Sequence, residues 1–195
     1  MKYSISTQMT KTAIVNALKK MMLKKPLGKI TVREIIEDCG VNRQTFYYHF
    51  QDIYDLTEWM FEQEAIELLK RSDSCITWDE GIRLVFSYVK DNKHICESAL
   101  DSLGREHLQR FFYKDVEELM KNIIYEHKGD LKVSDKYLDF ISEFYTLALV
   151  SYLVQWMREG MKETPEELIN LIRITMTGNI KAALERAANE NVIRD

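Results

Sequence analysis

The chain has 195 residues, of which 46% are hydrophobic and 30% charged, with two prolines and seven glycines. This composition excludes collagen-like chains, low-complexity chains and global disorder, so we expect one large domain or two small ones. The net charge of -4 is uneven, because residues 1–50 hold nine Lys or Arg and three acids. A basic quarter joined to an acidic remainder predicts contact with a polyanion, and a solvated basic helix fits the charge alone equally well.

The sequence lacks the signals of membrane insertion and export. No stretch reaches about 18 uninterrupted apolar residues, and the first residues carry lysines where a cleavage site needs small residues. Cys39, Cys75 and Cys96 are odd in number and form no C-x-x-C pair, which favours reduced thiols over a disulfide or a zinc site. We therefore expect a cytoplasmic protein.

Apolar residues recur at three- and four-residue steps, which predicts helices almost throughout. Capping boxes, in which a Thr accepts from a first-turn amide and a Glu reaches back, mark helix starts at Thr31, Thr77 and Thr164. Helix breaks are expected at residues 26–28, 40, 72–74, 129 and 160. The predicted helices span residues 8–24, 31–39, 42–48, 53–72, 78–91, 94–103, 105–127, 134–160 and 164–189.

Residues 30–50, ITVREIIEDCGVNRQTFYYHF, contain the most specific signal. Thr31 caps a helix of about nine residues, Gly40 supplies the left-handed conformation that ends it, and Asn42 caps a second, very short helix. A helix, a glycine turn and a second capped helix predict a helix-turn-helix, whose second helix enters the major groove of DNA.

The side chains of the second helix divide between two sides. Phe46 and Phe50 lie one turn apart and are expected to anchor it inward. On the other side, Arg pairs with guanine, Gln pairs with adenine, and Tyr or His donates to phosphate oxygens. Such residues are also common on solvated surfaces, but the capped motif and the basic quarter favour DNA contact. The expected DNA-facing residues are Arg43, Gln44, Thr45, Tyr47, Tyr48 and His49.

The stretch from about residue 10 to residue 62 resembles the DNA-binding domain of TetR/AcrR-type transcriptional regulators. The family pattern is close to T-x-Y-x-H-F followed by a fourth helix, and this chain has TFYYHF at 45–50 and DIYDL at 52–56. The run RQTFYYHFQDIYDLTEWMF is also similar to the branch that regulates dihydroxyacetone kinase, some of whose members work with a protein co-regulator.

The resemblance implies roles for single residues. The third position after the closing Phe is commonly a phosphate-binding Lys in the family, and here it is Ile53. We expect Lys24, Lys25 or Lys29 to compensate. The other implied roles are phosphate binding by Thr31 and Tyr47, contact with the DNA backbone by His49, and base reading by Arg43, Gln44 and Thr45.

The resemblance also implies a DNA-binding domain at 1–51 and a helical effector-binding and dimerisation domain at 52–195. Independently, two long helices near the C-terminus are apolar over too wide an arc for one neighbour. Pairing with their symmetry mates in a four-helix bundle would bury both faces and match a palindromic operator. Their apolar residues are Tyr137, Leu138, Ile141, Phe144, Tyr145, Ala148, Leu149, Tyr152, Leu153 and Trp156, then Leu168, Ile169, Leu171, Ile172, Met176, Ile180, Ala183 and Leu184.

Aromatic residues of the C-terminal part predict a core more strongly than a ligand pocket, because they recur at helical spacing. The family commonly has an effector cavity in this part. The ligand-binding candidates are therefore the residues that combine bulk with a polar group, namely Tyr88, Tyr145, Tyr152 and Trp156.

The sequence contains no pattern that is typical of a metal site or a catalytic site. His94, His107 and His127 lie apart and form no pair with metal-ligand spacing. The chain has no Gly-rich phosphate loop and no nucleophile, base and orienting residue in a recognisable arrangement. We expect no metal, no cofactor and no enzymatic activity.

These features together predict an all-α, homodimeric TetR-type repressor that binds a palindromic operator and responds to a ligand or a partner protein. Two alternatives remain open. A protein-interaction co-regulator with weakened DNA binding fits the acidic charge and Ile53, and it predicts no salt-sensitive affinity for DNA. A helical small-molecule carrier or enzyme would use the C-terminal aromatics, and it predicts ligand binding that substitutions of Arg43 and Tyr47 leave unchanged.

Overall fold

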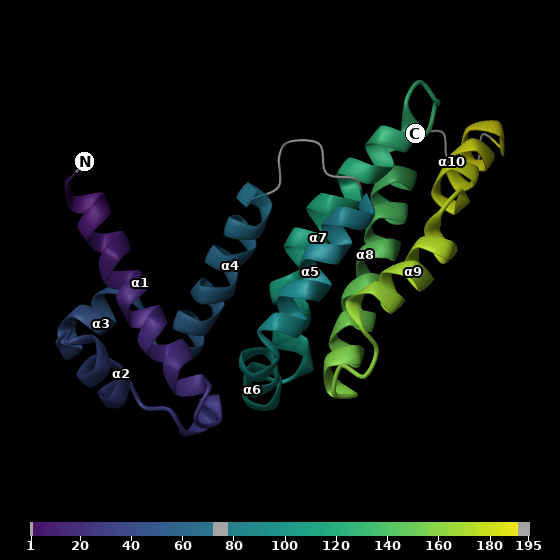
Figure 1. The fold of residues 1–195 in the computed structure, drawn as a ribbon. Coiled ribbons are helices and arrows are strands. Elements are labelled where there is room, and N and C mark those ends of the chain that lie inside the picture. The colour runs from purple at the N-terminus through teal and green to yellow at the C-terminus, as the bar shows by residue number, and fades with distance from the viewer. Residues whose placement is uncertain (1, 72–77, 191–195) are drawn as a thin grey trace. The chain divides into compact units, whose positions relative to one another are not determined.

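The structure, a computed structural model, describes residues 2–71 and 78–190. Every regular element in these two ranges is a helix, which confirms the all-α fold (Figure 1). The elements are α1 (Lys2–Met22), the 3-10 helix η1 (Leu27–Lys29), α2 (Val32–Cys39), α3 (Arg43–His49), α4 (Ile53–Arg71), α5 (Trp78–Asp91), α6 (Lys93–Leu103), α7 (Arg105–Lys128), α8 (Asp135–Arg158), α9 (Pro165–Met176) and α10 (Asn179–Glu190).

Most predicted helix bounds agree with the structure to within a few residues, and two do not. α1 already begins at Lys2, well before the predicted residue 8. The single helix predicted for 164–189 is wrong, because the chain turns between α9 and α10 at Gly178, whose φ of 78° is a conformation that favours glycine. The capping boxes at Thr31 and Thr164 are confirmed, and Thr77 lies outside the described residues.

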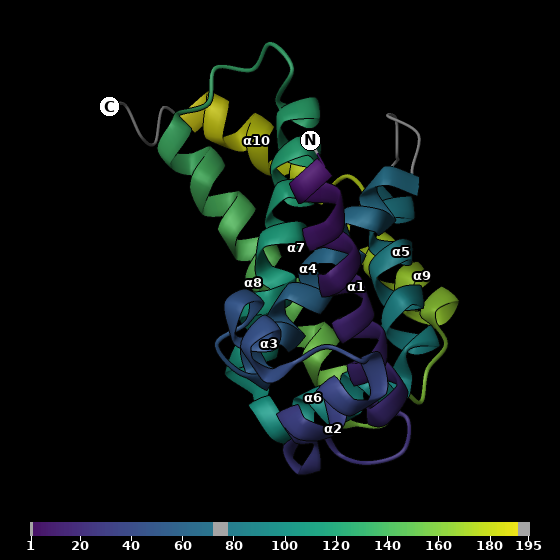
Figure 2. The same cartoon turned by 90° about the vertical axis from the view of Figure 1, so that its left-hand side faces the viewer.

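The chain forms two compact units, Met1–Arg71 with Asn92–Phe111 and Ser72–Asp91 with Phe112–Asp195. In the first unit, α1 packs against α2, α4 and α6, and α2 packs against α3 (Figures 1 and 2). Because apolar side chains of each helix meet in the middle, this unit has its own hydrophobic core. Its fully buried side chains include Ile14, Leu18, Ile35, Phe46, Leu56 and Met60.

In the second unit, α5 and α10 pack against α9, and Trp156 of α8 is buried in the core. The Phe86 ring lies 5.4 Å from the Trp156 ring. By length and composition alone α8 could cross a membrane, but core helices of soluble proteins pass the same test, and 44% of its most apolar window is buried. Ten residues of α8 are buried in the structure, Trp156 among them, so α8 is a core helix of the second unit.

Two of the three cysteines lie in described residues, and both are free thiols. Cys39 is half-buried, whereas Cys96 is buried in α6. Burial raises the pKa of the Cys96 thiol to about 12. Cys75 lies outside the described residues. Cys96 is therefore a structural residue with an unreactive side chain.

Candidate nucleic-acid interface

The first helix of the predicted helix-turn-helix begins with a complete capping box. The Thr31 hydroxyl accepts from the Glu34 amide at 3.3 Å, and the Glu34 carboxylate accepts from the Thr31 amide at 2.9 Å. Lys25 Nζ donates to the same carboxylate at 2.6 Å. The Lys25 ammonium, followed by the Thr31 hydroxyl and amide, lowers the pKa of Glu34 from 4.5 to about 2. These bonds fix where α2 begins.

The turn between α2 and α3 has the chemistry that the sequence predicts. Gly40 has φ 71° and ψ 19°, the left-handed conformation that ends α2. The Asn42 side chain then accepts from the Thr45 amide at 2.8 Å and caps α3. The two helices and this turn form the helix-turn-helix, and α3 is its recognition helix.

Two phenylalanines anchor the recognition helix from its inner side. Phe46 is 0% exposed and Phe50 is 2% exposed, and their ring centres lie 6.0 Å apart. The Lys11 ammonium lies over the Phe50 ring at 5.2 Å and over the Trp59 ring at 5.0 Å, which ties α1 to α3 and α4 through cation–π contacts. The prediction that Phe46 and Phe50 face inward is confirmed.

The opposite side of the recognition helix carries polar side chains that face solvent. Arg43 and Gln44 are exposed, Thr45 is half-buried, and Tyr48 is 81% exposed. The Arg43 guanidinium lies over the Tyr47 ring at 5.5 Å and donates to the Tyr47 hydroxyl at 3.5 Å. The structure thus brings these residues together on one exposed helix.

His49 closes the recognition helix and is half-buried. Its ring lies edge-on to the Tyr48 ring at 4.9 Å. Burial, followed by the charge of Lys11, lowers the pKa of His49 below its usual 6.5. The imidazole is therefore mainly neutral at pH 7.

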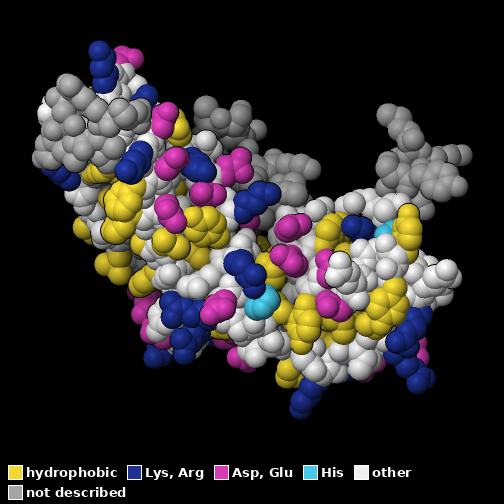
Figure 3. Space-filling model, turned by 180° about the vertical axis from the view of Figure 1, so that it is seen from behind, with side chains coloured by type: hydrophobic (Ala, Val, Ile, Leu, Met, Phe, Trp, Pro, Cys, Tyr) yellow, Lys and Arg dark blue, Asp and Glu magenta, His cyan; other side chains and the backbone are white. Residues whose placement is uncertain are grey.

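The lysines near this surface differ in what they contact. Lys25 is engaged with Glu34 and with the Lys29 carbonyl oxygen, and Lys20 of α1 pairs with Asp38 of α2. Lys24 and Lys29 are exposed. Lys and Arg side chains project from the right-hand end of the view in Figure 3, over the first unit. The exposed lysines therefore lie in the segment between α1 and α2, which leads into the helix-turn-helix.

Sequence reasoning missed two features of the first unit. Tyr54, at the start of α4, is 49% exposed, and the Lys11 ammonium lies over the rings of Phe50 and Trp59. Ile53, where the family commonly has Lys, is half-buried. Leu56 and Met60 are four residues apart on the buried side of α4, and this spacing predicts that Tyr54 faces outward. No neighbouring residue in the sequence indicates the contacts of Lys11.

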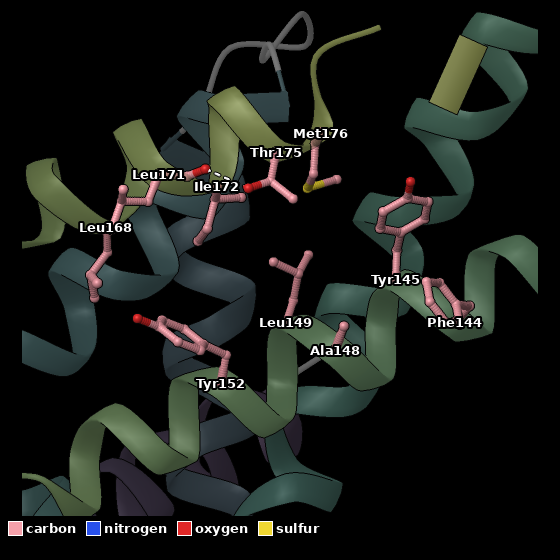
Figure 4. Close-up of a pocket in the computed structure, with 10 residues that line it drawn as sticks. All are labelled: Phe144, Tyr145, Ala148, Leu149, Tyr152, Leu168, Leu171, Ile172, Thr175 and Met176. Carbon is pink, nitrogen blue, oxygen red and sulfur yellow. Dashed lines mark hydrogen bonds between the residues drawn. The ribbon is translucent and has the colours of Figure 1, made fainter. Parts of the chain in front are cut away.

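A pocket of about 360 Å³ lies in the second unit between α8 and α9 (Figure 4). Of the ligand-binding candidates, Tyr145 and Tyr152 line it. Trp156 is 2% exposed, and its indole N–H donates to the Glu163 carbonyl oxygen at 3.3 Å, so its polar group is used inside the core. Tyr88 is half-buried on α5. The lining residues are Phe144, Tyr145, Ala148, Leu149, Tyr152, Leu168, Leu171, Ile172, Thr175 and Met176.

Comparison with known proteins identifies the family. A profile described as bacterial regulatory proteins, tetR family, matches residues 14–58, and one described as a transcriptional regulator C-terminal region matches residues 76–178. The second match alone spans more than half of the chain. The chain belongs to the TetR family of transcriptional regulators.

One relative is similar to this chain in sequence, and one solved structure is similar to it in fold. The HTH-type dhaKLM operon transcriptional activator DhaS of Lactococcus lactis subsp. lactis (strain IL1403) is 26% identical over 176 residues, which are 88% of this chain and 91% of the relative. The solved structure of dihydroxyacetone kinase operon activator DhaS matches with a TM-score of 0.71 at 23% identity, over 89% of this chain and 97% of that one. This chain is similar to both.

The family assignment settles the broad function. The chain is a DNA-binding transcriptional regulator with a helix-turn-helix, and it is not an enzyme. Regulators of this family are soluble bacterial proteins that bind DNA and act as dimers. Within the described part of the chain, no three His, Cys, Asp or Glu side chains are grouped so that they could hold a metal ion.

Proposed function

We propose that this chain binds a palindromic operator as a homodimer and regulates transcription from it. The observation that carries the proposal is the exposed side of α3, where Arg43 and Gln44 face solvent on a helix that Phe46 and Phe50 anchor from behind. Arg and Gln pair bidentately with guanine and adenine in the major groove. The base-reading residues we propose are Arg43, Gln44 and Thr45, and the phosphate contacts come from Thr31, Tyr47, Tyr48, His49 and the lysines Lys24, Lys25 and Lys29.

The operator is found by selecting bound sequences from a random duplex pool. The affinity of the chain for the most enriched duplex is then measured at two salt concentrations. Arg43→Ala should weaken operator binding by about 1–3 kcal/mol and relax the preference at one base pair. Lys24→Ala, the control for a phosphate contact, should weaken operator and random DNA alike and flatten the salt dependence. Equal losses on both DNAs for Arg43→Ala would remove its base-reading role, and an unenriched pool would favour the co-regulator alternative.

We propose that the dimer forms through α8 and α9 of the second unit. Phe144 of α8 is 57% exposed and Ile174 of α9 is 66% exposed, and the Phe140 and Phe144 rings stack at 6.1 Å. Hydrophobic side chains also gather on the left-hand part of Figure 3, over this unit. A contiguous exposed apolar surface marks an interaction site. The exposed large apolar side chains on these helices are Phe140, Phe144, Leu147, Tyr152, Leu171 and Ile174.

The pocket between α8 and α9 belongs to this same surface, because Phe144, Tyr152 and Leu171 line it. We propose that side chains of the second copy fill it, since self-complementary two-fold interfaces pack apolar knobs into matching hollows. Tyr145 and Tyr152 then serve the interface. A small effector is the alternative occupant.

The dimer surface is tested by Ile174→Asp, which should convert the dimer to a monomer in light scattering after size exclusion. Tyr125→Asp is the matched control, because Tyr125 is likewise a large exposed side chain, 53% exposed, on α7. A dimer that survives Ile174→Asp would place the interface elsewhere. A ligand that binds the monomer and not the dimer would assign the pocket to an effector.

The direction of regulation is proposed from the curated relative. That relative is named an activator of the dhaKLM operon, so we propose that this chain activates, where the sequence-based expectation was repression. A ligand or a partner protein on the second unit, in the cytoplasm, supplies the input. A reporter gene behind the selected operator, with and without the chain, decides the direction: higher expression supports activation and lower expression supports repression.

A further inference from the structure

Two serines of α6 bond to the backbone that leads into the helix-turn-helix. Ser98 Oγ accepts from the Leu27 amide at 2.7 Å, and Ser102 Oγ accepts from the Gly28 amide at 3.0 Å. Both bonds join parts of the first unit that are more than 70 residues apart in the chain. Ser98 and Ser102 are one helical turn apart, so both hydroxyls face the same side of α6. α6 packs against η1 and α1, and Figures 1 and 2 show it beside the C-terminal end of α1.

The two bonds replace a missing cap. The first amides of a helix have no acceptor within the helix, and a capping side chain usually supplies one. η1 follows Pro26, which makes no side-chain capping bond. The Leu27 side chain is 1% exposed, and Ser98 is buried as well, so solvent does not take the place of the serine. A buried amide without an acceptor is destabilising.

The position of η1 bears directly on DNA contact. Its C-cap is Ile30, a buried residue, and the next residue is Thr31, which caps α2. α2 in turn packs against α3. Holding the Leu27 and Gly28 amides therefore fixes the point from which the helix-turn-helix starts.

We propose that Ser98 and Ser102 are positioning residues for operator binding. Through these two serines, α6 holds the helix-turn-helix in the position that binds DNA. This inference rests on the operator binding proposed above. The two hydroxyls hold η1, and η1 holds the start of α2. A shift of α6 that separates the hydroxyls from these amides releases the start of α2 and lowers the affinity for the operator.

The test uses three variants of the full chain: Ser98→Ala, Ser102→Ala and the double variant that carries both changes. Amide exchange, read by mass spectrometry, should become faster in peptides that cover residues 27–31, and operator affinity should fall about tenfold when both hydroxyls are removed. Ser102 is only half-buried, so its variant does not threaten folding, and Ser102→Thr should restore both readouts. Ser142→Ala is the matched control, because this buried hydroxyl donates only to Leu138 of its own helix.

Three results would overturn the inference. Exchange at residues 27–31 that stays unchanged in both alanine variants means that the hydroxyls do not hold η1. Faster exchange with unchanged operator affinity means that the bonds serve folding alone. A loss of affinity in Ser142→Ala equal to that in Ser98→Ala means that the effect is general. If the unmodified chain selects no sequence, the proposed operator binding fails, and the exchange data separate that failure from the serine bonds.

Discussion

Replacing Phe46 by alanine should melt the recognition helix locally. The Phe46 ring is 0% exposed and contacts the rings of Tyr47 at 5.4 Å and Phe50 at 6.0 Å. Truncating a buried Phe to Ala costs about 3–5 kcal/mol. α3 has seven residues, shorter than a helix that is stable by itself, so its anchors decide whether it forms.

The assay is amide exchange in peptides that cover residues 43–50. Far-UV circular dichroism of the whole chain is recorded beside it. A loss of about 3 kcal/mol corresponds to exchange that is faster by roughly 100-fold, since about 1.4 kcal/mol is a factor of ten. Tyr48→Ala is the matched control on the same helix: at 81% exposed, it should change stability by no more than about 0.5 kcal/mol. Both variants should lose DNA affinity. Exchange in Phe46→Ala within about twofold of the unmodified chain would refute the anchoring argument.

Three further predictions concern other residues. Glu34→Gln should lower the melting temperature above pH 4.5, and the difference should shrink as the pH falls toward 2, because Lys25 lowers the pKa of this carboxylate from 4.5 to about 2 and the benefit exists only while it is ionised; an undiminished difference at pH 2 would contradict this. Gly40→Ala should cost about 1–2 kcal/mol in urea denaturation because its φ is 71°, whereas Gly28→Ala, whose added carbon meets nothing closer than 3.6 Å, should be nearly neutral. With the other two cysteines replaced by serine, Cys96 should react with a thiol reagent at pH 8 only after unfolding, since burial raises its pKa to about 12.

Local signals predicted most of the fold. Thr31, Gly40 and Asn42 each act on their own neighbours within a few residues, so their sequence is sufficient to place the ends of α2 and the start of α3. The same locality explains the error between α9 and α10. Gly178 lies inside a strong apolar repeat, and the repeat outweighed the single glycine in the prediction.

Features that depend on distant residues were not predictable in this way. The stacking of Lys11 on Trp59 joins α1 to α4, and the bonds of Ser98 and Ser102 join α6 to η1. Neither serine stands in a recognisable motif, because its partner is a backbone amide, and every residue but proline has one. The exposed residues of α3 were predictable because their helix is short and only one side can be anchored.

On the recognition helix, the residues that hold the fold and the residues proposed to contact DNA lie on different sides. Asn42 and Phe46 hold the helix in place, whereas Arg43, Gln44 and Tyr48 project into solvent. Substitutions on an exposed surface usually change stability by less than about 0.5 kcal/mol. Related chains can therefore exchange the outward residues during evolution and acquire new operator sequences while the scaffold stays intact, so paralogues that share the inward residues can control different genes in one cell.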